Sequence, residues 1–150
     1  MRRSSYWFCP VVAMMCTRAV YAHHSFASIY ELTRNVTVDG MVTEFAFVHP
    51  HPYLVIEATD KSGNRRSWRA EMDNRFELAG IGIAATTFKP GDRVIVNGSP
   101  GRKESSNVFV WKLERRGDGL LYEQVGSTPR VTCQTSRHAL CAMHLSSARE

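Results

Sequence analysis

The sequence lacks the motifs by which many enzymes are recognised. It contains neither a Gly-x-Ser-x-Gly nucleophile elbow nor a glycine-rich phosphate loop, and no internal repeat is visible in its 150 residues. The carboxylates that could serve as general acids or bases near the middle of the chain are Glu44, Glu57, Glu71 and Asp73. Most carboxylates of this kind are solvated or cap turns, so a binding protein is favoured and an enzyme is the alternative.

The sequence also lacks positive charge where a nucleic-acid-binding domain needs it. The formal net charge is +5, but the surplus lies at the two ends, and residues 23–129 contain 13 Lys and Arg against 13 Asp and Glu. A protein that binds DNA or RNA needs a basic face to neutralise phosphates, so we predict no nucleic-acid partner. The aromatic residues that could stack on bases are then better explained as core residues; they are Phe45, Phe47, Trp68 and Trp111.

No apolar run is long enough to span a membrane, which takes about 20 residues. The first segment contains no acid, begins with two arginines and continues with an apolar stretch over residues 6–16. Val20 and Ala22 then occupy the −3 and −1 positions of a cleavage site. This order predicts a signal peptide over residues 1–22, a periplasmic or secreted protein, and no membrane association after cleavage. An uncleaved anchor is the alternative.

Cysteine is scarce, with four in the chain. Cleavage after Ala22 would remove two of them and leave Cys133 and Cys141, an even pair that can form a disulfide in an oxidising compartment. His138 and His144 could add imidazoles to this pair, but the spacing does not match the short Cys-x-x-Cys motif of zinc sites. A disulfide or a disordered tail is therefore the favoured interpretation.

The middle of the chain alternates β-branched and aromatic stretches with turn residues, which is the pattern of short strands. Gly40 interrupts the alternation of the first stretch and predicts a bulge or a sharp coil there. The predicted strands cover residues 36–48, 53–58, 65–71, 93–97 and 108–113, and a further apolar stretch covers residues 120–122.

A short helix is predicted between the third and fourth strands. Asn74 and Glu77 have the three-residue spacing of a capping box, and Phe76, Leu78 and Ala79 supply an apolar face. A long coiled first strand, with a helix between the third and fourth strands, is the topology of the OB-fold.

We therefore predict an all-β domain with one short helix, an OB-fold-like five-stranded barrel, over residues 23–125. A plain antiparallel β-sandwich is the alternative. No periodic apolar pattern continues after Gly126, so residues 126–150 are predicted to form a disordered tail.

Four histidines lie in two pairs, His23 with His24 and His49 with His51. The second pair belongs to a His-Pro-His-Pro turn between two predicted strands, and its prolines stiffen the backbone. Imidazole binds copper, zinc and nickel, and after cleavage His23 would add its α-amino group. All four are candidate metal ligands, with copper or zinc as the candidate cofactor. The alternative is that the first pair is a solvated chain end and the second bonds to the loop backbone.

Several short motifs along the chain occur together in a recognisable order and spacing. They are His23-His24-Ser25-Phe26, Gly40-x-Val42-x-Glu44, Pro50-His51, Trp68 with Glu71, Leu78-x-Gly80, Lys89-Pro90-Gly91-Asp92-x-Val94 and Gly98-x-Pro100. With these motifs, over about residues 23–122, the chain resembles a family of small exported bacterial proteins with a domain of unknown function, whose mature forms begin His-His-Ser-Phe. His49 stands where the family's turn usually has Asn, and the residues after Glu123 have no counterpart. The resemblance implies an exported β-barrel domain and no established activity.

The leading hypothesis is an exported OB-like domain that binds a small ligand or a metal ion at the His turn. His51 should matter most there, because a proline on each side restricts its backbone and lowers the entropy cost of capturing a ligand. Trp68 and Glu71 are candidate ligand-binding residues, since Glu71 ends the third predicted strand near the turn. The alternatives are a copper-dependent redox enzyme that uses His23 and an accessory module that docks a protein partner.

Overall fold

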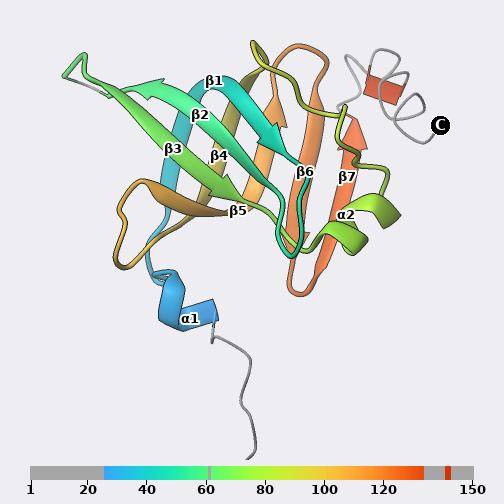
Figure 1. The fold of residues 1–150 in the computed structure, drawn as a ribbon, viewed down its shortest axis with the longest axis horizontal. Coiled ribbons are helices and arrows are strands. Elements are labelled where there is room, and N and C mark those ends of the chain that lie inside the picture. The colour runs from blue at the N-terminus through green and yellow to red at the C-terminus, as the bar shows by residue number, and fades with distance from the viewer. Residues whose placement is uncertain (1–25, 61, 134–140, 143–150) are drawn as a thin grey trace, which may run out of the picture.

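The computed structural model describes residues 26–60, 62–133 and 141–142, which form one seven-stranded sheet in the order β3-β2-β1-β4-β5-β6-β7 (Figure 1). The strands are β1 (Val36–Ala46), β2 (Tyr53–Thr59), β3 (Arg65–Glu71), β4 (Arg93–Pro100), β5 (Asn107–Arg115), β6 (Leu120–Val125) and β7 (Thr128–Cys133). The helices named here are α1 (Phe26–Ile29) and α2 (Arg75–Gly80). Among the described residues, no helix has the length and apolar character needed to cross a membrane.

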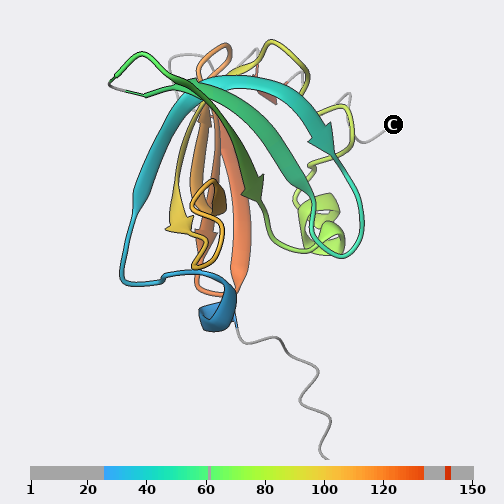
Figure 2. The same cartoon turned by 60° about the vertical axis from the view of Figure 1, so that its left-hand side comes forward.

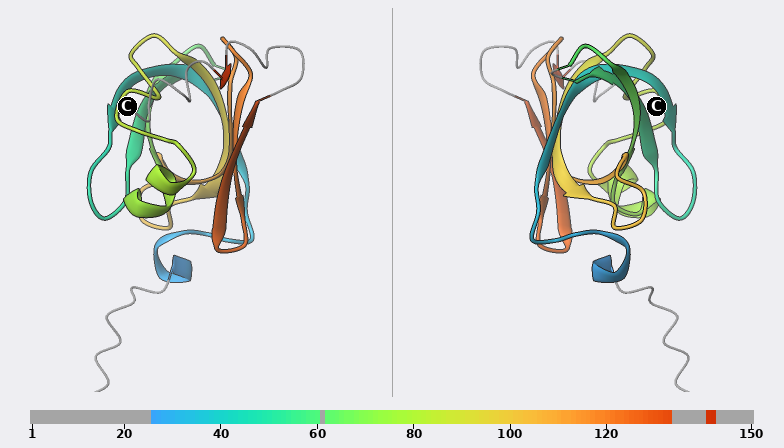
Figure 3. Two further views of the ribbon diagram at one scale, coloured as in Figure 1. Left: turned by 90° about the vertical axis from the view of Figure 1, so that its right-hand side faces the viewer. Right: turned by 90° about the vertical axis from the view of Figure 1, so that its left-hand side faces the viewer.

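A parallel contact between β3 and β5 closes the first five strands into a barrel, so that each strand pairs with two neighbours in the cycle β1-β2-β3-β5-β4. Figure 3 shows this ring, with β6 and β7 extending the sheet beyond it. The helix α2 lies between β3 and β4 in the chain, as in the OB-fold. The predicted OB-fold-like barrel is confirmed, and the alternative of a plain antiparallel β-sandwich is wrong.

Two glycines permit the strong bending of the barrel strands. A Cβ atom on Gly40 would overlap the backbone of Glu57 in β2, and one on Gly98 would overlap the backbone of Phe109 in β5. The pairing register of β1 with β2 shifts between Val42 and Glu44. The irregularity predicted at Gly40 therefore lies two to four residues further on, and Gly40 itself serves the close approach of two strands.

The barrel interior is filled by side chains that alternate along the strands. Side chains of α2 and of the segment that follows it are also part of this core. Its fully or nearly fully buried members include Val38, Val42, Leu54, Ile56, Leu78, Ile83, Phe88, Val94, Val96, Val108, Val110 and Leu113.

The capping residue of α2 is the predicted one, since the backbone N–H of Glu77 donates to Asn74 Oδ1 at 3.0 Å. The predicted apolar face is only partly correct, because Leu78 is buried whereas Phe76 is 77% exposed. Successive helical residues are separated by about 100°, so positions 76 and 78 cannot both face the barrel. The ring of Phe76 instead lies 4.9 Å from the ring of His49.

Strand β7 contradicts the prediction of a disordered tail for residues 128–133. It pairs with β6 over the full length of both strands, and Cys133 forms a disulfide with Cys141, which is fully buried. The strand was missed because it is an edge strand with few apolar residues and a proline, held largely by backbone pairing. Both cysteines are thus occupied by the disulfide, while His138, His144 and the rest of the tail lie outside the described residues.

The sequence pattern predicts that truncation after Gly126 spares the core, and the structure reverses this expectation. Cys141 belongs to the core, and Val131 and Cys133 pack against it. The truncation is expected to lower the free energy of unfolding by more than about 2 kcal/mol, the size of a core loss. Urea unfolding measures this change, with truncation after Ala142, which keeps every described residue, as the control. A loss no larger than that of the control would contradict the expectation.

Candidate functional site

The His turn joins β1 to β2 and is held by the segment that connects β3 to α2. The carbonyl of Pro50 accepts from the backbone N–H of Arg75 at 3.1 Å, and the carbonyl of Pro52 accepts from that of Met72 at 2.9 Å. The peptide bond between His49 and Pro50 is cis. Figure 2 shows the turn beside α2. The turn is therefore anchored on both sides of His51.

The two histidines of the turn have different surroundings. His49 is exposed and packs on the ring of Phe76. His51 is partly buried, and its Nδ1 atom is buried without a hydrogen-bond partner among the described residues. Buried polar atoms are normally hydrogen-bonded, and leaving one unsatisfied costs about 1–3 kcal/mol. Nδ1 of His51 is therefore an unsatisfied polar atom that the surrounding protein encloses, on a ring that is otherwise partly exposed.

The other predicted metal ligands, His23 and His24, lie outside the described residues. Within the part of the chain that the structure describes, no three His, Cys, Asp or Glu side chains are grouped so that they could hold a metal ion. The His turn by itself therefore does not form a complete metal site.

The two predicted ligand-binding residues, Trp68 and Glu71, point to opposite faces of β3, because side chains three positions apart on a strand alternate. Trp68 packs against the core, with the guanidinium carbon of Arg66 4.8 Å from the centroid of its ring. Glu71 accepts a hydrogen bond of 2.8 Å from the hydroxyl of Tyr30. The structure does not bring Trp68 and Glu71 into one site.

The bond to Glu71 belongs to the docking of α1 and Tyr30 on the outer face of the barrel. The ring of Phe26 lies 4.2 Å from that of Phe109, and Trp111 packs 4.9 Å from Phe109. Tyr30 is only 2% exposed, and its burial, together with the negative charge of Glu71, raises its pKa well above the ordinary value. Trp111, expected in the core, is thus part of an aromatic cluster that holds the N-terminal segment.

Polar contacts fasten the same segment to the loop between β4 and β5. The guanidinium of Arg102 donates to the carbonyl of Ala27 and to the carboxylate of Glu31, each at 2.7 Å. The backbone N–H of Arg102 donates to the carbonyl of Ile29 at 2.9 Å, and that of Glu31 to the carbonyl of Pro100 at 2.8 Å.

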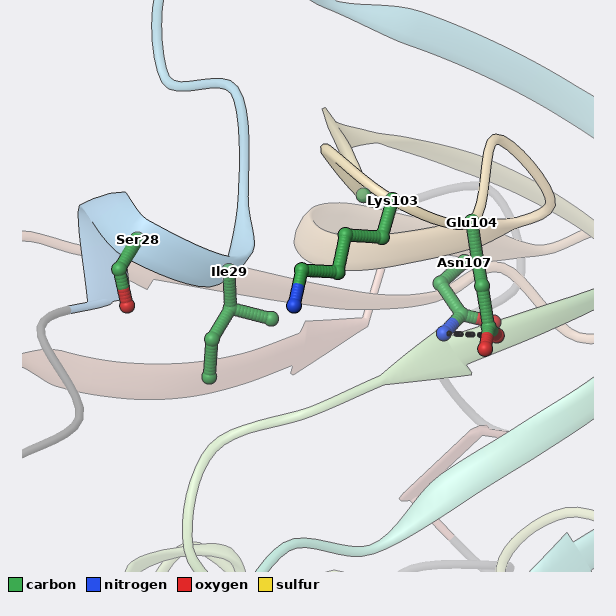
Figure 4. Close-up of a pocket in the computed structure, with 6 residues that line it drawn as sticks. Ser28, Ile29, Lys103, Glu104 and Asn107 are labelled. Atoms are coloured by element: carbon green, nitrogen blue, oxygen red, sulfur yellow. Dashed lines mark hydrogen bonds between the residues drawn. The ribbon is translucent and has the colours of Figure 1, made fainter.

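A pocket of ≈ 390 Å³ lies between this segment and the loop (Figure 4). Its walls come from three short stretches of sequence, two of which are about 70 residues apart, so no local motif signals it. The lining residues are Ser28, Ile29, Gly101, Lys103, Glu104 and Asn107.

One family model matches most of the chain, and the comparisons leave the ligand undefined. A model described as "Family of unknown function (DUF6152)" matches residues 11–115. No curated protein matches the chain.

Solved structures with a similar fold include the N-terminal domain of PriB from Thermoanaerobacter tencongensis, at 20% identity and a TM-score of 0.39, covering 55% of this chain and 96% of that one. A small single-stranded DNA-binding protein from Streptomyces coelicolor is 14% identical, with a TM-score of 0.38. The match covers 56% of this chain and 92% of that one. A ZRD-deleted mutant of TiaS in complex with agmatine is 19% identical, with a TM-score of 0.41. The match covers 62% of this chain and 26% of that one. The absence of a nucleic-acid partner stays a prediction.

Replacing Tyr30 with Phe tests the contact that holds the N-terminal segment. Tyr30→Phe removes a hydrogen bond to a carboxylate and is expected to lower the free energy of unfolding at pH 7 by about 1–3 kcal/mol. The pKa of Tyr30 is raised in the folded protein from its ordinary value of 10.0, so on alkalinisation the unfolded chain loses this proton first. The stability linked to the raised pKa, which comes first from burial and then from Glu71, is fully present below about pH 10 and is lost as the pH rises further.

Urea unfolding at pH 7 and near pH 11 measures both effects. The wild-type protein should lose more stability over this interval than Tyr30→Phe. Tyr122, whose pKa burial also raises, is present in both proteins and cancels from the comparison. Equal losses in the two proteins would mean that the Tyr30 hydroxyl makes no special contribution.

Proposed function

We propose that this chain, which belongs to the DUF6152 family of unknown function, is an exported OB-like domain that binds a small ligand or a metal ion at the His turn. The single observation that carries the proposal is the buried Nδ1 atom of His51, which has no hydrogen-bond partner among the described residues. A ligand that donates to this atom, or a metal ion that coordinates it, would offset the cost of burying it once the residues that cover it had moved aside.

The anchoring of the turn supports this role for His51. The bonds from Arg75 and Met72 to the two prolines fix the backbone on both sides of the imidazole. A group held in place before binding loses little conformational entropy on capture of a ligand. His49 lacks this advantage, because its ring is exposed and already packs on Phe76.

A metal ion would need further donors, and the N-terminal segment is their proposed source. Phe26 packs against Phe109 of β5. Phe109 pairs with Glu71 at the end of β3. Glu71 also pairs with Tyr53 at the start of β2. His51 is two residues before Tyr53. Three residues of extended chain span about 10 Å, so the proposal requires the turn to lie within that reach of Phe26.

Titration with Cu(II) and Zn(II) tests the metal form of the proposal. In protein that begins at His23, His51→Ala and His23→Ala should each weaken binding by more than about tenfold. The double variant should lose less than the sum of the two effects, because ligands of one ion act as a unit. His49→Ala is the matched control from the same turn and should have a milder effect. Calorimetry measures the affinities.

The results separate the versions of this proposal. If neither ion binds, the metal form is rejected and an organic ligand at the turn is left. Equal, small and additive losses for all three histidines would mean scattered surface sites and would reject the turn itself. Thermal melts of each variant without metal show whether a change in affinity reflects loss of the fold.

Export is the second part of the proposal and is tested separately. The charged start, the apolar stretch and the Val20-x-Ala22 order are expected to direct cleavage before His23. Intact mass and N-terminal sequencing of exported protein should give a chain that begins His-His-Ser-Phe. A mature chain that retains Arg18 would contradict the cleavage site and remove the amine of His23 as a metal ligand.

A further inference from the structure

The pocket between α1 and the β4–β5 loop contains two charged groups of opposite sign that do not pair with each other. Figure 4 shows the side chain of Lys103 running toward Ile29, while that of Glu104 turns toward Asn107. Neither Lys103 nor Glu104 belongs to any of the ion pairs between described residues. The pocket therefore presents a cation at one side and an anion at the other.

The carboxylate of Glu104 is held in position by its neighbour. The side-chain amide of Asn107 donates to Glu104 Oε2 at 2.9 Å, and the backbone N–H of Asn107 donates to the carbonyl of Glu104, also at 2.9 Å. These bonds leave Oε1 of Glu104 without a hydrogen-bond partner among the residues that the structure describes. The negative side of the pocket is thus oriented in advance, with an oxygen able to accept from a ligand.

The loop that carries these residues is itself fixed. The backbone N–H of Gly101 donates to the carbonyl of Asn107 at 2.8 Å, and a Cβ atom at position 101 would lie 2.6 Å from the carbonyl oxygen of Glu104. Only glycine fits this approach. The contacts of Arg102 with Ala27 and Ile29 fasten the opposite wall. A pocket held in this way loses little entropy when it binds a ligand.

The charges decide which class of small molecule suits the pocket. A simple anion would be attracted by Lys103 and repelled by Glu104, and a simple cation would meet the reverse. A molecule that carries both charges satisfies both groups. The side chain of Ile29, which is 46% exposed, adds an apolar wall that a hydrocarbon group could cover. The volume of ≈ 390 Å³ lies toward the small end of ligand pockets.

We propose that this pocket binds a small zwitterion with an apolar side chain, that is, a free apolar α-amino acid. Its carboxylate would bind the ammonium of Lys103, its amino group would donate to Glu104, and its side chain would cover Ile29. This site is separate from the His turn, so the result of the metal titration neither supports nor contradicts it.

The experiment uses L-leucine and two analogues that each lack one charge: leucinamide, without the carboxylate, and N-acetyl-leucine, without the ammonium group. In ¹H–¹⁵N spectra, millimolar leucine should cause saturable shifts of the backbone amides of Ile29, Gly101, Lys103 and Asn107. Each analogue should bind at least about fivefold more weakly, because a charged group of the pocket is left unpaired.

Charge-removing variants assign each contact. Lys103→Met should weaken leucine binding by about tenfold and abolish the preference for leucine over leucinamide. Glu104→Gln should abolish the preference over N-acetyl-leucine. Each of these changes corresponds to one charged hydrogen bond. Lys89→Met, which alters an exposed lysine that does not line this pocket, is the matched control and should leave binding unchanged.

The outcomes that overturn the proposal are equally specific. Absence of saturable shifts, equal binding of all three probes, or unchanged leucine affinity in Lys103→Met would each reject it. Thermal melts check that the variants fold. Ile29→Ser tests the apolar contact separately, because it leaves both charged groups of the pocket in place. Its expected effect is weaker binding of leucine with an unchanged preference over the two analogues.

Discussion

The short parallel contact between β3 and β5 is the constraint on which the rest of this structure depends. It consists of the pairs Arg69–Asn107, Ala70–Val108 and Glu71–Phe109. Without it, β3 would be the edge of an open sheet and one side of the apolar strands would lack a partner. With it, β1 to β5 enclose their side chains, and Glu71 is placed beside Phe109 on the outer surface.

That placement is what allows the N-terminal segment to dock. Tyr30 can reach Glu71 and the aromatic cluster of Phe109 at once, because barrel closure sets the ends of β3 and β5 side by side. The segment then covers the outer face of β5 and forms one wall of the pocket, whose other wall is the loop leading into β5. The pocket is therefore a consequence of barrel closure, and Asn107, which pairs with Arg69, lines it.

A buried ion network stabilises the C-terminal end of β5. Arg115, at the end of β5, is 5% exposed and forms a bidentate pair with Asp118, a bond to Asp92 and a bond to the carbonyl of Thr87. This network joins the segment after α2 to the turn between β5 and β6. A buried charge with every partner present is tolerated, whereas loss of one partner typically costs about 3–5 kcal/mol.

Local patterns predicted the parts of the fold that local forces determine. The bounds of β3, the N-cap of α2 and the position of the turn follow from alternation, from Asn74 and from the prolines. Patterns failed where long-range pairing decides, as in β7, which β6 recruits despite its few apolar residues. The candidate site divides in the same way. The histidines of the turn were visible in the sequence, whereas the unpartnered nitrogen of His51 depends on burial that no local pattern encodes.

The distribution of charged residues shows most clearly what a sequence can and cannot specify. A balanced count over residues 23–129 argues against a continuous basic face, and that inference concerns large polyanionic partners. A balanced count says nothing about how far apart the opposite charges lie. Lys103 and Glu104 cancel in any sum over the sequence, yet their side chains diverge across one pocket because Asn107 holds the carboxylate and the loop turns at Gly101. A neutral pocket whose opposite charges are separated favours small ligands that carry both signs. A neutral surface can also arise because its opposite charges form ion pairs. The sequence does not distinguish these two cases, whereas the folded structure does.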